Sequence, residues 1–144
     1  MNMSNILCVC TGNICRSPLA EVYLASKLGA REITSAGTHA LVDKPPDENA
    51  ISIAGADGWD ISGHRARQLD DAISRKQDLI LVMEHSQLHW VRANFPFTRG
   101  KVFLLSQWKD QENIDDPYRH SREFFDVIYR RIASCADDWV DRLK

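Results

Sequence analysis

Apolar residues along the chain follow two different patterns. Residues 5–10 and 78–83 are short, nearly continuous apolar runs, which are typical of strands buried on both faces of a parallel sheet. Residues 32–37 and 101–105 are weaker segments of the same kind, and they predict two further strands. The chain is therefore expected to contain four strands, with helical segments between them.

The clearest helix start follows the first predicted strand. Ser17 is a favourable N-cap residue, Pro18 suits the first helical position, and Glu21 then falls in the first turn. Ser17 has a competing interpretation, in which its hydroxyl serves the loop before the helix. These signals predict a helix from Pro18 onward.

Three more helices are predicted further along the chain. The sequence Pro-Pro-Asp at residues 45–47 introduces one over residues 48–58, which Gly55 should weaken. A second is predicted over residues 85–94. The third begins at the capping-type residue Ser121 and is long, because apolar residues recur at spacings of three and four along one face. These residues are Phe124, Phe125, Ile128, Ile132, Cys135, Trp139 and Leu143.

The alternation of strands and helices predicts a small doubly wound α/β fold, because right-handed crossovers place parallel strands side by side. No linker, repeat or low-complexity stretch interrupts the 144 residues, so residues 1–144 are expected to form one domain. In folds of this kind the active site lies outside the carboxyl ends of the strands. Residues 11–16, directly after the first strand, are expected at that position.

Composition and charge exclude several classes of partner. The formal net charge is −2, and no long block of like charges occurs, so neither a nucleic acid nor an anionic membrane is an expected partner. The apolar run near the start is far shorter than the ~20 residues of a membrane-spanning helix. We expect a soluble, cytoplasmic protein without membrane insertion, in which the four cysteines stay reduced.

Candidate chemistry lies in residues 10–18, with the sequence Cys-Thr-Gly-Asn-Ile-Cys-Arg-Ser-Pro. Consecutive backbone N–H groups that lead into a helix can surround the oxygens of a phosphoryl group, and Gly12 and Asn13 tolerate the unusual backbone such a turn demands. Arg16 can add a bidentate clamp. The spacing from Cys10 to Arg16 is a weak signal alone, but the strand before it and the helix after it predict a phosphate-binding loop.

The same positive surroundings favour the thiolate of Cys10, and only a thiolate is a useful nucleophile near neutral pH. Ser17 can direct its hydroxyl at this sulfur and stabilise the thiolate; the alternative is that it only caps the helix. Cys8 and Cys135 are interpreted as core residues. A reversible disulfide between Cys15 and Cys10 is a hypothesis.

At this loop the sequence resembles the low-molecular-weight protein tyrosine phosphatase family, whose Cys-x-Gly-Asn-x-Cys-Arg-Ser-Pro motif is matched at every fixed position. Residues 35–38, 63–67, 78–84 and 116–118 resemble further family landmarks in the family's order. The resemblance implies a three-layer doubly wound fold, with a central four-stranded parallel sheet and helices on both faces. It also implies hydrolysis of phosphotyrosine through a cysteinyl-phosphate, with no metal and no cofactor.

The resemblance also implies roles for individual residues. Cys10 would be the nucleophile, Arg16 the phosphate clamp, and Asp116 the general acid and base, with Asp115 as the competing candidate for the acid. The other implied site residues are Thr11, Gly12, Asn13, Ile14, Cys15 and Ser17 of the phosphate-binding loop, Ser35 and His64 as its hydrogen-bonded support, and Leu41 and Tyr118 as pocket walls.

Leu41 stands where some relatives have an aromatic wall, and this aliphatic version resembles a bacterial subgroup that acts on tyrosine autokinases of exopolysaccharide export. The expected partner is therefore a phosphotyrosine protein, in particular a tyrosine autokinase, and the expected state is a monomer. Arg119 and His120 follow Tyr118 where some relatives have a second aromatic residue, so the sequence does not predict substrate preference at that rim.

Three alternatives stay open from the sequence. An arsenate reductase on the same fold also uses a loop cysteine, but it needs further redox cysteines, and none occurs between Cys15 and Cys135. A zinc-binding module could use Cys8, Cys10 and Cys15, although a second pair of ligands is missing. A noncatalytic phosphotyrosine-binding module would keep the loop without the chemistry, which the presence of Asp116 disfavours.

Overall fold

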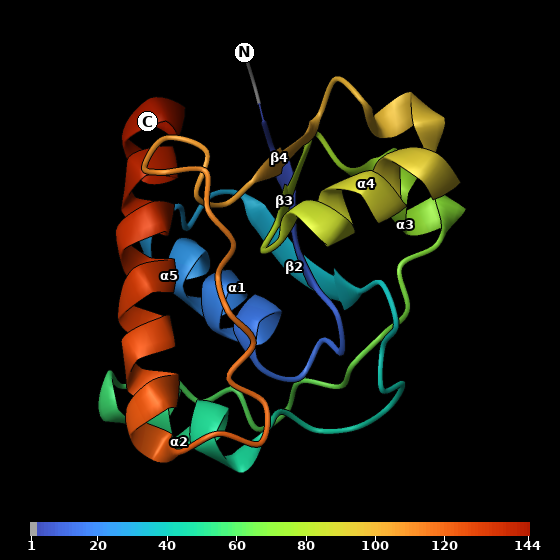
Figure 1. The fold of residues 1–144 in the computed structure, drawn as a ribbon. Helices are drawn as coiled ribbons and strands as arrows, with labels where there is room; N and C mark the ends of the chain where they lie inside the picture. The colour runs from blue at the N-terminus through green and yellow to red at the C-terminus, as the bar shows by residue number, and fades with distance from the viewer. Residues whose placement is uncertain (1–2) are drawn as a thin grey trace.

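A four-stranded parallel sheet, with the strand order β2-β1-β3-β4, lies at the centre of the protein in a computed structural model that describes residues 3–144 (Figure 1). Residues 1–2 of the predicted domain lie outside the described residues. β1 pairs with both β2 and β3, and β3 also pairs with β4. The strands are β1 (Asn5–Cys10), β2 (Glu32–Gly37), β3 (Leu79–Val82) and β4 (Val102–Leu104).

Helices cover both faces of the sheet (Figure 1). One face carries α1 (Arg16–Lys27), α2 (Glu48–Ala56) and α5 (Arg122–Leu143), and the other carries α3 (Asp71–Lys76) and α4 (His85–Asn94). A short 3-10 helix, η1 (Pro96–Thr98), follows α4. The predicted three-layer, doubly wound α/β fold is confirmed.

Alternate side chains of β1 enter two separate hydrophobic cores, because successive side chains of a strand point to opposite faces of the sheet. Ile6 and Cys8 belong to the core under α1 and α5, whereas Leu7 and Val9 belong to the core under α4. All four side chains are fully buried. This two-sided burial explains the continuous apolar run in the sequence. Cys135 joins Cys8 in the first core, as predicted.

The structure contains each predicted strand and helix, together with two short elements that the sequence pattern did not predict. α3 has six residues, of which only Ser74 is buried, so it lacks an apolar periodicity; η1 has three residues. α2 ends at Ala56, before the predicted end at residue 58. α1 begins at Arg16, so Pro18 is not the first helical residue.

The loop after β1 lies at the topological switch point of the sheet. β1 leads through α1 to β2 on one side, and its other neighbour is β3, so the connections diverge at the carboxyl end of β1, where ligands bind in such folds. Cys10 ends β1 and pairs with Gly37 at the end of β2. A Cβ atom at Gly37 would lie 2.4 Å from the carbonyl oxygen of Thr11. The loop and the end of β2 therefore fit together only with glycine at this position.

Gly37→Ala is expected to displace the backbone at Thr11, because side-chain rotation cannot relieve a clash with a backbone oxygen. Overpacking of this kind lowers the free energy of unfolding by about 1–3 kcal/mol, which urea denaturation measures. Gly55→Ala is the matched control: its Cβ meets nothing within 4 Å, and it should stabilise helix α2 by about 0.5–1 kcal/mol. Equal stability of the two variants would contradict the close contact at Gly37.

Candidate active site

The carbonyl groups of the loop between β1 and α1 all point away from its centre. Each carbonyl oxygen of residues 10–14 accepts a hydrogen bond from a group outside the loop. For four of these oxygens the donor is a backbone N–H within residues 38–47. The fifth, the carbonyl oxygen of Asn13, is 2.8 Å from Nε2 of His64. Because the C=O and N–H of one peptide unit point in opposite directions, the N–H groups of residues 11–15 point toward the inside of the loop. They form a ring of donors at the N-terminal end of α1.

Asn13 holds the loop in this conformation. Its φ of 62° lies in the left-handed region, which asparagine adopts more readily than most residues. Its buried side chain donates from Nδ2 to the hydroxyls of Ser17 (2.8 Å) and Ser35 (3.0 Å), and Oδ1 accepts from the backbone N–H of Arg67 (2.9 Å). Of the two residues expected to tolerate an unusual backbone, Asn13 has a positive φ and Gly12 does not. The side-chain bonds of Asn13 stabilise the left-handed turn.

The hydroxyl of Ser17 is directed at the sulfur of Cys10, with Oγ and Sγ 2.9 Å apart. Both hydrogens on Nδ2 of Asn13 are used, one for Ser17 and one for Ser35. The Ser35 hydroxyl donates its own hydrogen to Glu21, 2.5 Å away. Ser17 Oγ is therefore an acceptor toward Asn13, and its single hydrogen is left for the sulfur.

The predicted N-cap role of Ser17 is wrong. α1 begins at Arg16, so Ser17 is the second helical residue, and the N-cap position falls on Cys15, whose side chain makes no capping hydrogen bond. The physical reason is that the Ser17 hydroxyl is already bonded to Asn13 and Cys10. The same shift moves the acidic residue predicted for the first turn out of that turn.

The four cysteines have different surroundings, although all are free and buried. Burial raises the pKa of the Cys8 and Cys135 thiols, and burial together with the charge of Asp47 raises the pKa of Cys15. These three thiols are protonated near neutral pH. The sulfur of Cys10 instead accepts a serine hydrogen bond and lines a cavity. An arsenate reductase relay through Cys135 would require the core to open, so the structure disfavours that alternative.

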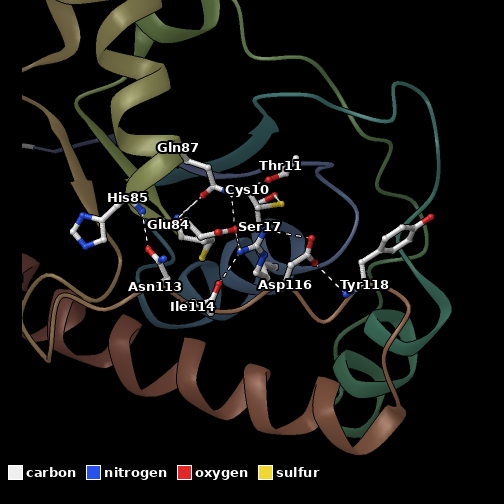
Figure 2. Close-up of polar contacts among 12 residues, drawn as sticks. Cys10, Thr11, Ser17, Glu84, His85, Gln87, Asn113, Ile114, Asp116 and Tyr118 are labelled. Atoms are coloured by element: carbon white, nitrogen blue, oxygen red, sulfur yellow. Dashed lines mark hydrogen bonds and ion pairs between the residues drawn. The ribbon is translucent and has the colours of Figure 1, made fainter.

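The guanidinium of Arg16 is deeply buried, with 1% of the side chain exposed. Nη1 donates to Oε2 of Glu84 at 2.6 Å and to the carbonyl oxygen of Ile114 at 2.7 Å, and Nη2 lies 3.6 Å from Oδ2 of Asp116. Figure 2 labels the three partner residues, Glu84, Ile114 and Asp116. Nε is buried and has no hydrogen-bond partner within residues 3–144. Buried N–H donors are nearly always paired in folded proteins. Arg16 also lines the cavity, so this buried donor without a partner lies close to the space that a ligand would occupy.

A cavity of about 180 Å³ lies over the loop. It is lined by Cys10, Thr11, Gly12, Ile14, Cys15, Arg16, His39, Leu41, Asp116 and Tyr118. Of the two candidates for the acid, Asp116 is among the lining residues and Asp115 is not. Leu41 and Tyr118 are exposed hydrophobic residues of this lining.

The segment of residues 111–118 brings Asp116 to the cavity. The backbone N–H of Ile114 donates to the carbonyl oxygen of Met83 at 2.9 Å, which fixes the segment to the end of β3. Oδ1 of Asp116 accepts from the backbone N–H of Tyr118 at 3.0 Å. The Asp116 side chain is 45% exposed. One carboxylate is thus held beside the cavity while it stays in contact with solvent.

The structure brings all the predicted site residues to the cavity or to the hydrogen bonds behind it, and it adds four that sequence reasoning missed: Glu21, His39, Glu84 and Gln87. A signal existed for Glu84, because a carboxylate after a buried strand lies at the same sheet edge as Cys10. No signal existed for Glu21 and His39, whose contacts depend on the paths of α1 and of the loop after β2.

Within residues 3–144, no group of three or more His, Cys, Asp or Glu side chains is arranged to hold a metal ion. The zinc alternative therefore finds no set of ligands around Cys8, Cys10 and Cys15. In the same part of the chain, no helix has both the length and the apolar character needed to cross a membrane.

A parallel sheet whose first strand ends in a ring of inward N–H donors defines an anion-binding α/β protein. The sequence matches the low molecular weight phosphotyrosine protein phosphatase family over residues 5–144, and the chain belongs to this family. It is 41% identical over 143 residues to the low molecular weight protein-tyrosine-phosphatase Etp of Escherichia coli strain K12. The aligned region covers 99% of this chain and 97% of Etp.

Solved structures of similar proteins have the same fold. The tyrosine phosphatase Wzb from Escherichia coli K30, crystallised in complex with sulphate, superposes on this chain with a TM-score of 0.95 and is 42% identical to it. The superposition covers 99% of this chain and 100% of the Wzb chain. Vibrio vulnificus Wzb in complex with benzylphosphonate has a TM-score of 0.95 at 39% identity, with the same coverage. The chain is similar to both over nearly its whole length.

Iodoacetate is expected to alkylate Cys10 selectively at neutral pH, because burial raises the pKa of the other three thiols. Ser17→Ala should slow this alkylation about tenfold or more, since a hydrogen bond to a charged group contributes about 1.5–3 kcal/mol. Ser26→Ala, an exposed change on the same helix, is the control. Mass spectrometry over a time course gives the rate at each cysteine. Equally fast alkylation of any other cysteine would contradict the distinction between the thiols.

Proposed function

We propose that the protein is a protein tyrosine phosphatase that hydrolyses phosphotyrosine through a cysteinyl-phosphate on Cys10, within one domain of residues 1–144. Arg16 is the phosphate clamp, and Asp116 is the general acid and base. Membership of the phosphatase family and similarity to Etp and Wzb support the reaction. The geometry of the cavity supports the roles of the three residues.

The observation that carries the proposal is a set of hydrogen-bond donors directed at one small cavity that a cysteine sulfur lines. The N–H groups of residues 11–15 point to the inside of the loop that borders this cavity, and Arg16, whose Nε has no partner within residues 3–144, lines it. The three nonbridging oxygens of a phosphoryl group need such donors, and the positive end of the α1 dipole adds to their attraction. The carboxylate of Asp116 beside the cavity is the group that a binding module without chemistry would not need.

In the first step, the Cys10 thiolate attacks phosphorus and forms an S–P bond while the P–O bond to the tyrosine breaks. Asp116 donates its proton to the departing phenolate oxygen. In the second step, Asp116 as a carboxylate takes a proton from a water molecule, whose oxygen attacks the same phosphorus. The S–P bond then breaks, inorganic phosphate leaves, and the Cys10 thiolate is restored. The hydroxyl of Ser17 stabilises the sulfur in both steps.

The residues behind the cavity hold the loop rather than transfer protons. Asn13 joins the hydroxyls of Ser17 and Ser35, and His64 holds the carbonyl oxygen of Asn13. The donors are therefore oriented before a phosphate arrives, so that little of the binding free energy is lost in ordering them.

Leu41 and Tyr118 provide the apolar walls that suit an aromatic leaving group. The two residues are 43% and 39% exposed, and both line the cavity that Cys10 also lines. A phenyl ring can lie against these walls while its phosphate reaches the sulfur. The short side chain of phosphoserine would bring the substrate backbone to the rim without filling the apolar space.

The second part of the proposal is that the substrate is a tyrosine autokinase of exopolysaccharide export and that the enzyme acts in the cytoplasm as a monomer. The support is Leu41, whose aliphatic side chain resembles the bacterial subgroup with this role, and the similarity to low molecular weight protein-tyrosine-phosphatases of Escherichia coli. Loss of phosphotyrosine from such a kinase, with wild-type protein and not with Cys10→Ser, is the result that would support it.

Hydrolysis of phenyl phosphate in the presence of EDTA tests the catalytic assignment. The wild-type protein should be active, and Cys10→Ser should fall to background, because a serine hydroxyl is not ionised near neutral pH. Asp116→Asn should lower kcat by about 100-fold or more, the range for loss of a general acid. Asp115→Asn is the matched control outside the cavity and should leave kcat nearly unchanged.

Two results would contradict this assignment. Activity that survives in Cys10→Ser would exclude the nucleophile. Equal losses of kcat in the Asp115 and Asp116 variants would exclude the choice of the acid.

Phosphotyrosine peptides should be hydrolysed with a much higher kcat/KM than phosphoserine peptides of the same sequence. Tyr118→Ala should raise KM for the phosphotyrosine peptide about fivefold, because an aromatic contact contributes about 0.5–1.5 kcal/mol, with kcat less affected. Steady-state kinetics with both peptides measures the difference. Equal kcat/KM for the two peptides would contradict selectivity for tyrosine.

A further inference from the structure

We propose that Gln87, in the first turn of α4, is a positioning residue that fixes the phosphate-binding loop and Arg16 relative to each other. The inference rests on the proposed phosphatase function and concerns a residue that acts through its neighbours. Gln87 is buried, with 3% of the residue exposed. Figure 2 shows it between Thr11 on one side and Glu84 on the other.

Two backbone donors fix the orientation of the Gln87 amide. Oε1 accepts from the N–H of Met83 at 2.9 Å and from the N–H of Glu84 at 3.0 Å, and only the oxygen of an amide side chain can accept. Nε2 must therefore face the other way. It donates to Oγ1 of Thr11 at 3.0 Å, and Thr11 directly follows Cys10 and lines the cavity.

The same amide borders the carboxylate that holds Arg16. Nε2 of Gln87 is 3.4 Å from Oε2 of Glu84, and this oxygen accepts from Nη1 of Arg16 at 2.6 Å. Nη1 also donates to the carbonyl oxygen of Ile114. The guanidinium cannot rotate without breaking both bonds, so its unpartnered Nε keeps its direction. One buried amide thus connects a residue of the loop with the residue that orients the clamp.

The sheet explains why a residue of α4 reaches the loop. β3 lies beside β1, with Val9 paired to Val82, so the residues after both strands emerge at the same edge. α4 begins at His85, and Gln87 completes a capping box with Glu84 at the start of this helix. The capping box alone would make Gln87 a structural residue. Its donor side, which faces Thr11, is the part that the cap does not use.

Gln87→Glu separates the cap from the positioning role. Glutamate serves as well as glutamine in a capping box, so the variant keeps both backbone bonds to residues 83 and 84. Its carboxylate has no hydrogen to donate to Thr11, so the bond persists only if the Thr11 hydroxyl turns and becomes the donor, and it adds a negative charge beside Glu84. We expect kcat/KM for phenyl phosphate to fall about tenfold and the competitive Ki of inorganic phosphate to rise by a similar factor. His89→Ala, an exposed change on the same helix, is the control with unchanged kinetics.

Thr11→Val tests the same bond from the other side and keeps the test valid if Gln87→Glu does not fold. It should also raise the phosphate Ki, and Thr11→Ser, which keeps the hydroxyl, should raise it less. The double variant Gln87→Glu with Thr11→Val should lose less than the product of the two single losses, because the two residues share one bond. Partial unfolding would lower the active fraction and thus kcat, and would leave KM and Ki unchanged.

The failures of the two proposals are distinguishable. A wild-type phosphate Ki in Gln87→Glu or in Thr11→Val, with an active wild-type enzyme, would overturn the inference and leave the proposed function intact. A wild-type protein without phosphatase activity would overturn the proposed function. In that case the effect of Gln87 on the loop is measured by how strongly inorganic phosphate protects Cys10 from iodoacetate. Equal protection in wild type and Gln87→Glu would overturn the inference.

Discussion

The outward direction of the loop carbonyls is the constraint on which the rest of the site depends. Five successive peptide units after β1 place their N–H groups on one side, an arrangement that the dipoles of these units oppose. The chain offsets this cost by giving each carbonyl of residues 10–14 a donor, from residues 38–47 or from His64. β2 matters to the site for this reason, since its last residue, Gly37, touches Thr11 and the donors follow directly after it.

Two carboxylates share the charge of Arg16 unequally. Glu84 is bound at 2.6 Å and is 26% exposed, whereas Asp116 lies at 3.6 Å and is 45% exposed. The short, shielded pair orients the guanidinium. The longer pair is screened by water and contributes little to stability, so Asp116 is not tied to the guanidinium as Glu84 is. One arginine can therefore remain fixed by Glu84 while the second carboxylate beside it stays in contact with solvent, as the mechanism proposed above requires of Asp116.

The fold could be predicted from the sequence because its signals are local. The runs at β1 and β3 are apolar on both faces, and the face of α5 follows from spacings of three and four, with Ser121 at its start accepting from the N–H of Phe124. α3 could not be predicted, because a helix of six residues with one buried side chain has no periodicity. The start of α1 was predicted incorrectly for a physical reason: Ser17 has the side chain of a cap, but the nearby sulfur and Asn13 provide its partners.

The site divides in the same way between local and nonlocal parts. Residues 10–17 are continuous in the chain, so the donors, the sulfur and the clamp are all visible in the sequence. The groups that hold them come from elsewhere: Glu84 and Gln87 follow a strand that is adjacent in space and distant in sequence. Such contacts depend on strand order, which periodicity alone does not specify. Neighbouring parallel strands end at one edge of the sheet, so polar residues that directly follow the strands next to such a loop are the first candidates for its support. With the strand order known, this rule points to Glu84 and Gln87.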